Sequence, residues 1–121
     1  MQALRDFHQA WGYVAILANA GAGVAGLIVW RVPRARGRWV WILTVGAEAI
    51  LLLQVVCGVV LVSDDGYTVA RFHMFYGFVA FVAVGLAYSY RFQMSGRLEL
   101  LYGLVGLFLM GVGIRAVMQV V

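Results

Sequence analysis

The amino-acid sequence predicts an all-α integral membrane protein in which four transmembrane helices form an up-down-up-down bundle. Composition is the first observation behind this prediction: 64% of the 121 residues are hydrophobic, 12% are charged, and the mean hydropathy is +0.94. An ordinary soluble domain carries about 25% charged residues. The chain therefore has too few ionised groups to cover a surface that faces water.

Long apolar runs are the second observation. A membrane-spanning helix needs about 20 consecutive, mostly apolar residues. Four runs reach this length, and they cover residues 7–30, 39–62, 69–90 and 98–121. The connectors between them are so short that consecutive helices must be antiparallel neighbours. Residues 1–121 are accordingly expected to form a single transmembrane domain.

The placement of arginine is the third observation, and it predicts the orientation. Every basic residue is Arg, a composition typical of GC-rich genomes. Those in or beside the first and third connectors are Arg31, Arg34, Arg36, Arg38, Arg91 and Arg97. Positively charged loops are retained in the cytoplasm. We therefore expect connectors 31–38 and 91–97 to be cytoplasmic, and both termini to lie on the outer side of a bacterial plasma membrane.

Aromatic residues are expected to mark both membrane interfaces. Those placed at the inner interface are Trp30, Trp39 and Trp41, and those at the outer one are Trp11, Tyr13 and Tyr67. Arg115 lies about 27 Å along its helix from Arg97. We therefore expect it near the outer interface, where it snorkels outward or pairs with Asp64 or Asp65.

The chain also repeats a short pattern. Residues 7–15 and 72–80 share Phe-His-x-x-aromatic-Gly-aromatic-Val-Ala at an offset of 65, and the pattern contains both histidines of the chain. A weaker echo is Gly-Arg at residues 37–38 and 96–97. Such repeats predict two helical hairpins related by a pseudo-twofold axis along the membrane normal.

His8 and His73 lie at matching positions in the first and third helices, which are diagonal in an up-down-up-down bundle. Each is followed four residues later by a glycine, Gly12 or Gly77, on the same helix face. This arrangement suits bis-histidine ligation of a b-type haem. The alternative is that the histidines are interfacial anchors and the glycines are close-packing sites. Two histidines without a nearby carboxylate ligand do not predict a metal site.

Two polar residues are expected near the bilayer midplane. Glu48 lies about 15 Å beyond Arg38 along its helix, and Asn19 lies about as deep in the first helix. A carboxyl group at this depth is unfavourable unless it faces the bundle or a partner. The favoured interpretation is a neutral Glu48–Asn19 hydrogen bond that joins the first two helices. The alternative is a proton or substrate site.

Small residues predict close helix packing. They recur along the first helix as Ala18, Ala22 and Gly26, and along the fourth as Gly103, Gly106, Gly111 and Gly113. Their number exceeds what a bundle of four thin helices needs. We therefore expect some of them to contact another membrane protein.

Three functions from different classes fit these features. The preferred one is a non-catalytic accessory subunit that docks on a larger membrane complex, stabilises it and binds no cofactor. The second is a b-type cytochrome that binds haem b through His8 and His73 near the outer leaflet. The third is a small homodimeric transporter with Glu48 and Asn19 at its substrate site.

Other classes are excluded by what the sequence lacks. No enzyme is expected, because the connectors are too short for a catalytic domain and contain no nucleophile or phosphate-binding motif. No nucleic-acid partner is expected either. Most of the basic residues lie in short loops, which indicates a role in orienting the chain in the membrane rather than a basic surface that binds nucleic acid.

The chain resembles the small four-helix proteins of GC-rich bacteria that accompany large transporters, such as the accessory subunit of mammalian-cell-entry (Mce) type lipid importers. The likeness lies in size, in the four-pass layout and in the arginine-only inner loop Arg31-Val32-Pro33-Arg34-Ala35-Arg36-Gly37-Arg38. The resemblance implies a partner permease and the uptake of lipids or fatty acids. It also implies that this subunit stabilises the assembly rather than transports.

Overall fold

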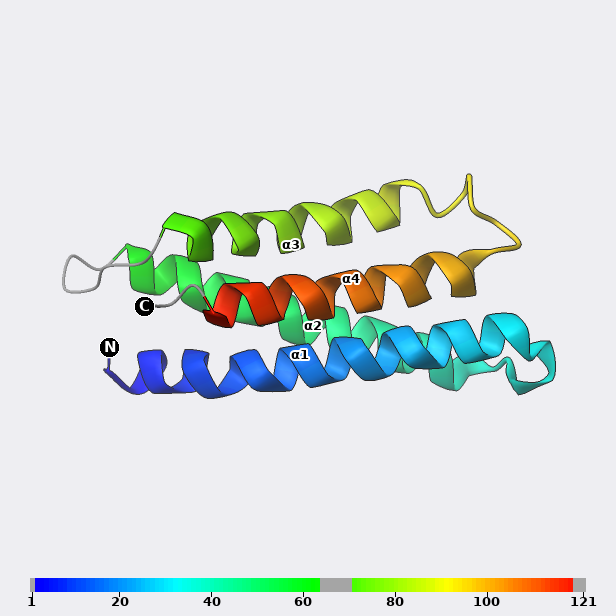
Figure 1. Ribbon diagram of the computed structural model, residues 1–121, viewed down its shortest axis with the longest axis horizontal. Helices are drawn as coiled ribbons and strands as arrows, with labels where there is room; N and C mark the ends of the chain where they lie inside the picture. Colours follow the sequence, from blue (N-terminus) through cyan, green and yellow to red (C-terminus); the bar gives the residue numbers. More distant parts are fainter. Residues whose placement is uncertain (1, 64–70, 119–121) are drawn as a thin grey trace.

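The computed structural model describes residues 2–63 and 71–118 (Figure 1). The helices are α1 (Gln2–Arg31), α2 (Arg38–Val62), α3 (Arg71–Ser89) and α4 (Leu98–Met118), with a short 3-10 helix η1 (Pro33–Ala35) after α1. No strand occurs in these residues. All four α-helices are long and apolar enough to cross a membrane. The prediction of an all-helical chain with four such helices is therefore confirmed.

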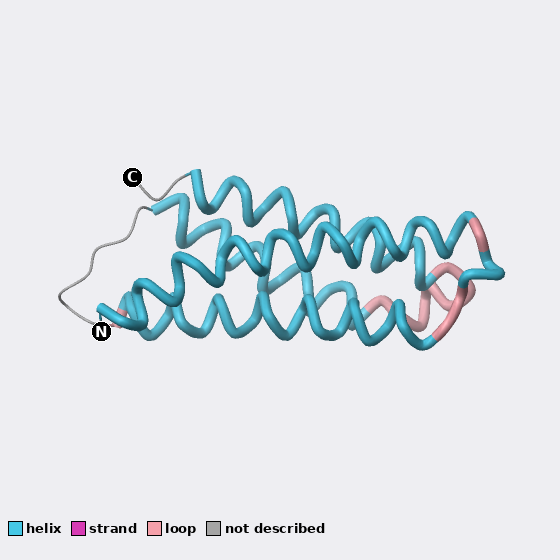
Figure 2. The backbone as a smooth tube through the Cα atoms, turned by 90° about the horizontal axis from the view of Figure 1, so that it is seen from below, coloured by secondary structure: helices cyan, strands magenta, loops and turns pink. Residues whose placement is uncertain are grey.

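The helices lie lengthwise beside one another (Figures 1 and 2), and α1 makes the most extensive contacts. It packs mainly against α4 and α2, whereas α3 packs against α4 and contacts α2 only loosely. Residues 32–37 and 90–97 connect helices at one end of the bundle, here called the arginine end (right in Figure 1). The first turns of α1 and α3 lie at the opposite end, here called the histidine end.

Helix α1 is longer than the apolar run predicts, because it begins at Gln2 rather than at Phe7. The residues before Phe7 include no proline or glycine, and the Gln2 side-chain amide donates to Asp6 Oδ1 over 3.0 Å. Such a pair at i and i+4 supports a helix. The helix ends at Arg31 because Val32 precedes Pro33, and a residue before proline disfavours the helical conformation.

The second turn at the arginine end joins α3 to α4. Gly96 has a φ of +89°, a conformation that L side chains rarely adopt. The backbone then enters α4, where the Leu101 N–H donates to the carbonyl of Arg97 over 3.0 Å. Glycine at position 96 therefore allows the tight reversal that returns the chain along α3.

Glycines bring α1 and α4 into backbone contact. A Cβ added to Gly26 would lie 3.0 Å from Gly103 Cα, and a Cβ added to Gly106 would lie 2.7 Å from Gly23 Cα. Further along, a Cβ on Gly113 would lie 2.7 Å from Ile16 Cγ1. These pairs advance in opposite directions along the two helices, so α1 and α4 are antiparallel.

The remaining small residues that the sequence singles out lie in different settings. Ala22 is buried and Ala18 is half-buried, whereas a Cβ added to Gly111 would meet nothing within 4 Å. The small faces formed by Gly26, Gly103 and Gly106 are thus occupied inside the bundle. They are not left over for another protein.

The buried core is thin. Its main cluster contains Ala15, Leu51, Ala80, Leu109 and Val112. Large apolar side chains are exposed along the helices, and on α3 they include Phe72, Phe75, Phe78 and Phe81. An apolar surface of this extent is expected where the surrounding solvent is lipid.

Candidate functional site

The two histidines of the chain meet at the histidine end. His8 lies on α1 and His73 on α3, and their ring centroids are 6.1 Å apart with an interplanar angle of 80°. Both rings are half-buried. Residues 65 positions apart in the sequence are thus brought to one depth by the fold.

The ring of His73 is held by α4. Its Nδ1 lies 2.7 Å from the carbonyl oxygen of Ala116. A carbonyl can only accept, so Nδ1 carries the proton and donates it. In the neutral ring the lone pair then lies on Nε2, which is the tautomer of a histidine ready to bind a metal through Nε2.

His8 is positioned mainly by α2. The side-chain amide of Gln54 donates to the His8 backbone carbonyl over 2.7 Å. Within the described residues, His8 Nδ1 and Gln54 Oε1 are buried and have no hydrogen-bond partner. An unpaired buried polar atom is unfavourable by about 1–3 kcal/mol. Two such atoms at one end of the bundle indicate a place where a ligand would be favourable.

Glycine makes room for the His8 ring, but from a helix that the sequence analysis did not consider. A Cβ added to Gly58 on α2 would lie 3.1 Å from His8 Cε1. Gly12 faces Gln54 instead, since its added Cβ would lie 3.1 Å from Gln54 Nε2. Near Gly77 an added Cβ would meet nothing within 4 Å. The sequence signal for the missed pair is a glutamine and a glycine at i and i+4 in an otherwise apolar run.

A cation lies on the same side as His73. The Nε and Nη2 atoms of Arg115 are each 3.4 Å from the hydroxyl oxygen of Tyr76, and Arg115 directly precedes Ala116. The guanidinium is therefore held between α4 and α3 at the histidine end. The suggested partners Asp64 and Asp65, like Tyr67, lie outside the described residues.

The predicted Glu48–Asn19 hydrogen bond is wrong. Asn19 is 1% exposed, and its amide donates to the carbonyls of Ala15 over 2.9 Å and of Ala47 over 3.3 Å. Ala47 is the residue of α2 that faces α1 here. Glu48 follows it and projects about 100° further around the helix, so its carboxyl is turned away from the amide.

A buried carboxylate that the sequence analysis overlooked lies at the arginine end. Glu99 is 6% exposed in the first turn of α4, and its Oε2 is 3.5 Å from Arg36 Nε. The sequence signal for it is an acidic residue two positions after the arginine-containing connector 91–97. Arg36 therefore forms an ion pair with Glu99, in addition to being one of the arginines that predict the orientation of the chain.

Two tryptophans placed at the interfaces also join helices. The Trp11 indole N–H donates to the Ile50 carbonyl over 2.9 Å, which links α1 to α2. Trp41 and Tyr102 make an edge-to-face contact with ring centroids 5.7 Å apart, which links α2 to α4. Tyr13 is exposed, as an interfacial anchor would be.

No cluster of three or more metal-ligating side chains occurs in the part of the chain that the structure describes. Cys57 is buried and free. The site therefore consists of two imidazoles from α1 and α3, the unpaired side-chain oxygen of Gln54, and Gly77, whose added Cβ would meet nothing within 4 Å. Comparison with protein-family models, curated proteins and solved structures finds no significant match.

Proposed function

We propose that this chain is a membrane-bound b-type cytochrome in which His8 and His73 hold one haem at the histidine end. The observation that carries the proposal is the pairing of these rings, 6.1 Å apart, from two helices that are distant in sequence. An interfacial anchor needs no second histidine beside it. A bis-histidine cofactor site requires one.

The separation of the rings fits two ligands on one metal. With ring centroids 6.1 Å apart, His8 and His73 lie close enough that both could hold one metal-containing cofactor. Ligand rings need not be parallel, so the interplanar angle of 80° is compatible with ligation.

The flat body of a haem needs an open flank beside the two rings. Helix α3 contacts α2 only loosely, and Gly77 has open space around it. Gly58 keeps α2 from pressing on His8. The side of the bundle between α2 and α3 is therefore where the cofactor would enter.

The residues of the chain would hold and tune the cofactor, which supplies one-electron redox chemistry when bound. The Ala116 carbonyl fixes the tautomer of His73 and makes it a more basic ligand. Arg115 places a positive charge at the same end, which favours carboxylate groups of a ligand. Gln54 keeps the backbone of His8 in place.

We further propose that the four helices cross a bacterial plasma membrane in up-down-up-down order, with the arginine end in the cytoplasm. The six arginines at that end support this orientation. The histidine end and both termini would then face outward. A pseudo-twofold relation between the hairpins is supported only near the histidines, because the α1–α4 contact is tight and its counterpart between α3 and α2 is loose.

Topology is testable by cysteine labelling, since the chain contains one cysteine. In a Cys57→Ala background, Arg34→Cys and Gln2→Cys place a single thiol at each end. An impermeant maleimide added to intact cells is expected to label only Gln2→Cys. Labelling of Arg34→Cys alone would reverse the orientation.

The accessory-subunit and transporter hypotheses gain no comparable observation. Gly26, Gly103 and Gly106 pack between α1 and α4, whereas Gly111 has nothing within 4 Å of an added Cβ. The Asn19 amide donates to the carbonyls of Ala15 and Ala47 rather than to Glu48. The cytochrome is the hypothesis for which the fold adds an observation.

Absorption spectroscopy tests the proposal directly. The chain is expressed with a haem supply and purified in mild detergent, and we expect a Soret band that His8→Ala and His73→Ala each abolish or shift. Tyr13→Ala, an exposed change on α1, is the control and should leave the band intact. A helical, monodisperse protein without a Soret band would contradict the proposal, as would a protein that carries only zinc or copper.

A further inference from the structure

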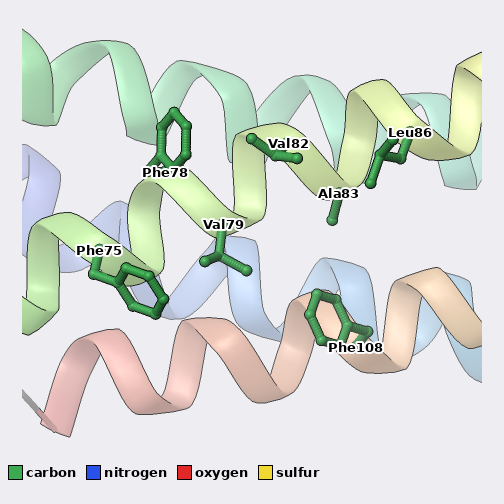
Figure 3. Close-up of a pocket in the computed structure, with 7 residues that line it drawn as sticks. All are labelled: Phe75, Phe78, Val79, Val82, Ala83, Leu86 and Phe108. Atoms are coloured by element: carbon green, nitrogen blue, oxygen red, sulfur yellow. The ribbon is translucent and has the colours of Figure 1, made fainter.

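A long apolar groove runs between α3 and α4, and its lining residues come from these two helices and the connector between them. Its wider part, about 470 Å³, is lined by residues that include Ala83, Tyr90, Met94, Leu101 and Val105. It adjoins a second hollow of about 220 Å³, with which it shares Ala83 and Leu86. Figure 3 shows Phe75, Val79 and Ala83 of α3 directed toward α4, with Phe108 opposite them.

The wide part of the groove opens at the arginine end, next to the connector that contains Gln93 and Met94. Arg97 directly precedes α4. Its carbonyl accepts the N–H of Leu101, so Arg97 lies one turn before this lining residue. Val105 lies one further turn along α4 and also lines the groove.

Two cations flank this mouth. Arg97 is exposed and forms no ion pair within the described residues. Arg91 lies in the connector between the lining residues Tyr90 and Gln93. Its guanidinium lies 3.6 Å from the centre of the Tyr88 ring and donates to the Tyr88 carbonyl over 2.6 Å, so it would turn from this ring to contact a phosphate at the mouth. The carboxylate of nearby Glu99 is buried and paired with Arg36, which leaves the mouth positively charged.

The length of the groove matches one leaflet. From Arg97 to Phe108 the helix rises about 16 Å at 1.5 Å per residue. Half of the hydrocarbon core of a bilayer is about 15 Å. An acyl chain that starts at the arginines would therefore end close to the Phe108 ring.

We propose that this groove binds one anionic glycerophospholipid, with its phosphate at Arg91 and Arg97 and one acyl chain between α3 and α4. The positive mouth selects an anionic headgroup over a zwitterionic one. The apolar walls select a lipid over free phosphate. This site lies at the opposite end from His8 and His73 and does not depend on the cofactor proposed there.

Native mass spectrometry of the full chain in detergent tests the site. Phosphatidylglycerol is titrated against phosphatidylcholine and inorganic phosphate, and we expect preferential retention of one phosphatidylglycerol. Arg91→Gln with Arg97→Gln should weaken this binding roughly thirtyfold. Arg31→Gln with Arg34→Gln removes the same charge from the other connector and should leave it unchanged.

A second variant tests the groove itself. Ala83→Phe fills the place where the two hollows meet and should reduce binding of both lipids, while helicity by circular dichroism stays constant. Equal retention of the two lipids would overturn the proposal, as would equal loss in the two arginine pairs. Binding of inorganic phosphate alone, or a homodimer that covers this face, would also overturn it.

Discussion

Gly23 of α1 and Gly106 of α4 touch through their backbones: a Cβ on Gly106 would lie 2.7 Å from both the Cα and the N of Gly23. Neither neighbour is a flexible side-chain end that can move aside. Close backbone approach at small residues is a main source of helix association in lipid. The first and last helices are thus joined by the tightest contact in the bundle.

Gly106→Ala is expected to destabilise the protein by about 1–3 kcal/mol, because overpacking of a close contact forces the helices apart. Gly111→Ala, on the same helix but with nothing within 4 Å of its added Cβ, is the matched control and should change stability little. Thermal unfolding in detergent measures both. Equal effects of the two variants would contradict the glycine contact.

Asn19 and Glu48 are expected to act independently. Asn19→Ala should destabilise the α1–α2 contact by about 1 kcal/mol, since it removes hydrogen bonds to Ala15 and Ala47. In a double-mutant cycle with Glu48→Gln, the coupling energy should stay below about 0.5 kcal/mol. A larger coupling would show that the carboxyl and the amide interact.

Arg36 is expected to stabilise α4 through Glu99. Arg36→Met leaves a buried carboxylate without its ion pair and should lower the free energy of unfolding by about 1 kcal/mol, since the arginine itself is exposed. Adding Glu99→Gln should restore part of the loss, because the neutral amide is easier to bury. Arg34→Met, at an exposed position in the same connector, is the control. An equal loss of stability in Arg34→Met would mean that the loss comes from removing any positive charge in this connector and not from the ion pair with Glu99.

Gly58 is expected to be required for the position of His8. Gly58→Val places side-chain atoms where the His8 ring lies and should displace the ring from His73. If the chain binds haem as proposed, the Soret band should weaken or shift. Gly46→Val introduces the same change on α2 at a place with nothing within 4 Å. An unaltered band in Gly58→Val would mean that His8 is not a ligand.

The number and approximate extent of the helices follow from the sequence, because a run of about 20 apolar residues is a strong signal for a helix long enough to cross a membrane. The pairing of His8 with His73 was also foreseeable from the repeated pattern at residues 7–15 and 72–80. The sequence does not reveal how each helix is rotated about its own axis. A helix that is apolar on all sides has no distinct apolar face, so its sequence does not indicate which side packs against a neighbouring helix.

Each local error has this cause. Asn19 was paired with Glu48 by depth alone, whereas the amide faces Ala47, one residue away and about 100° around α2. Gly12 was assigned to the space beside His8, which Gly58 of another helix provides. Glu99 was missed because its burial depends on how α4 turns toward the first connector.

The partnership of α1 with α4 has a consequence for biosynthesis. Protein chains emerge from the ribosome N-terminus first, so α1 is synthesised before the helix that covers its glycines. During that interval Gly23 and Gly26 lack their contacts with α4, and α2 is the main native neighbour that α1 can reach. Completion of the bundle therefore waits for α4 to be translated, and a chain truncated before α4 would remain an open hairpin of α1 and α2 with a loosely attached α3.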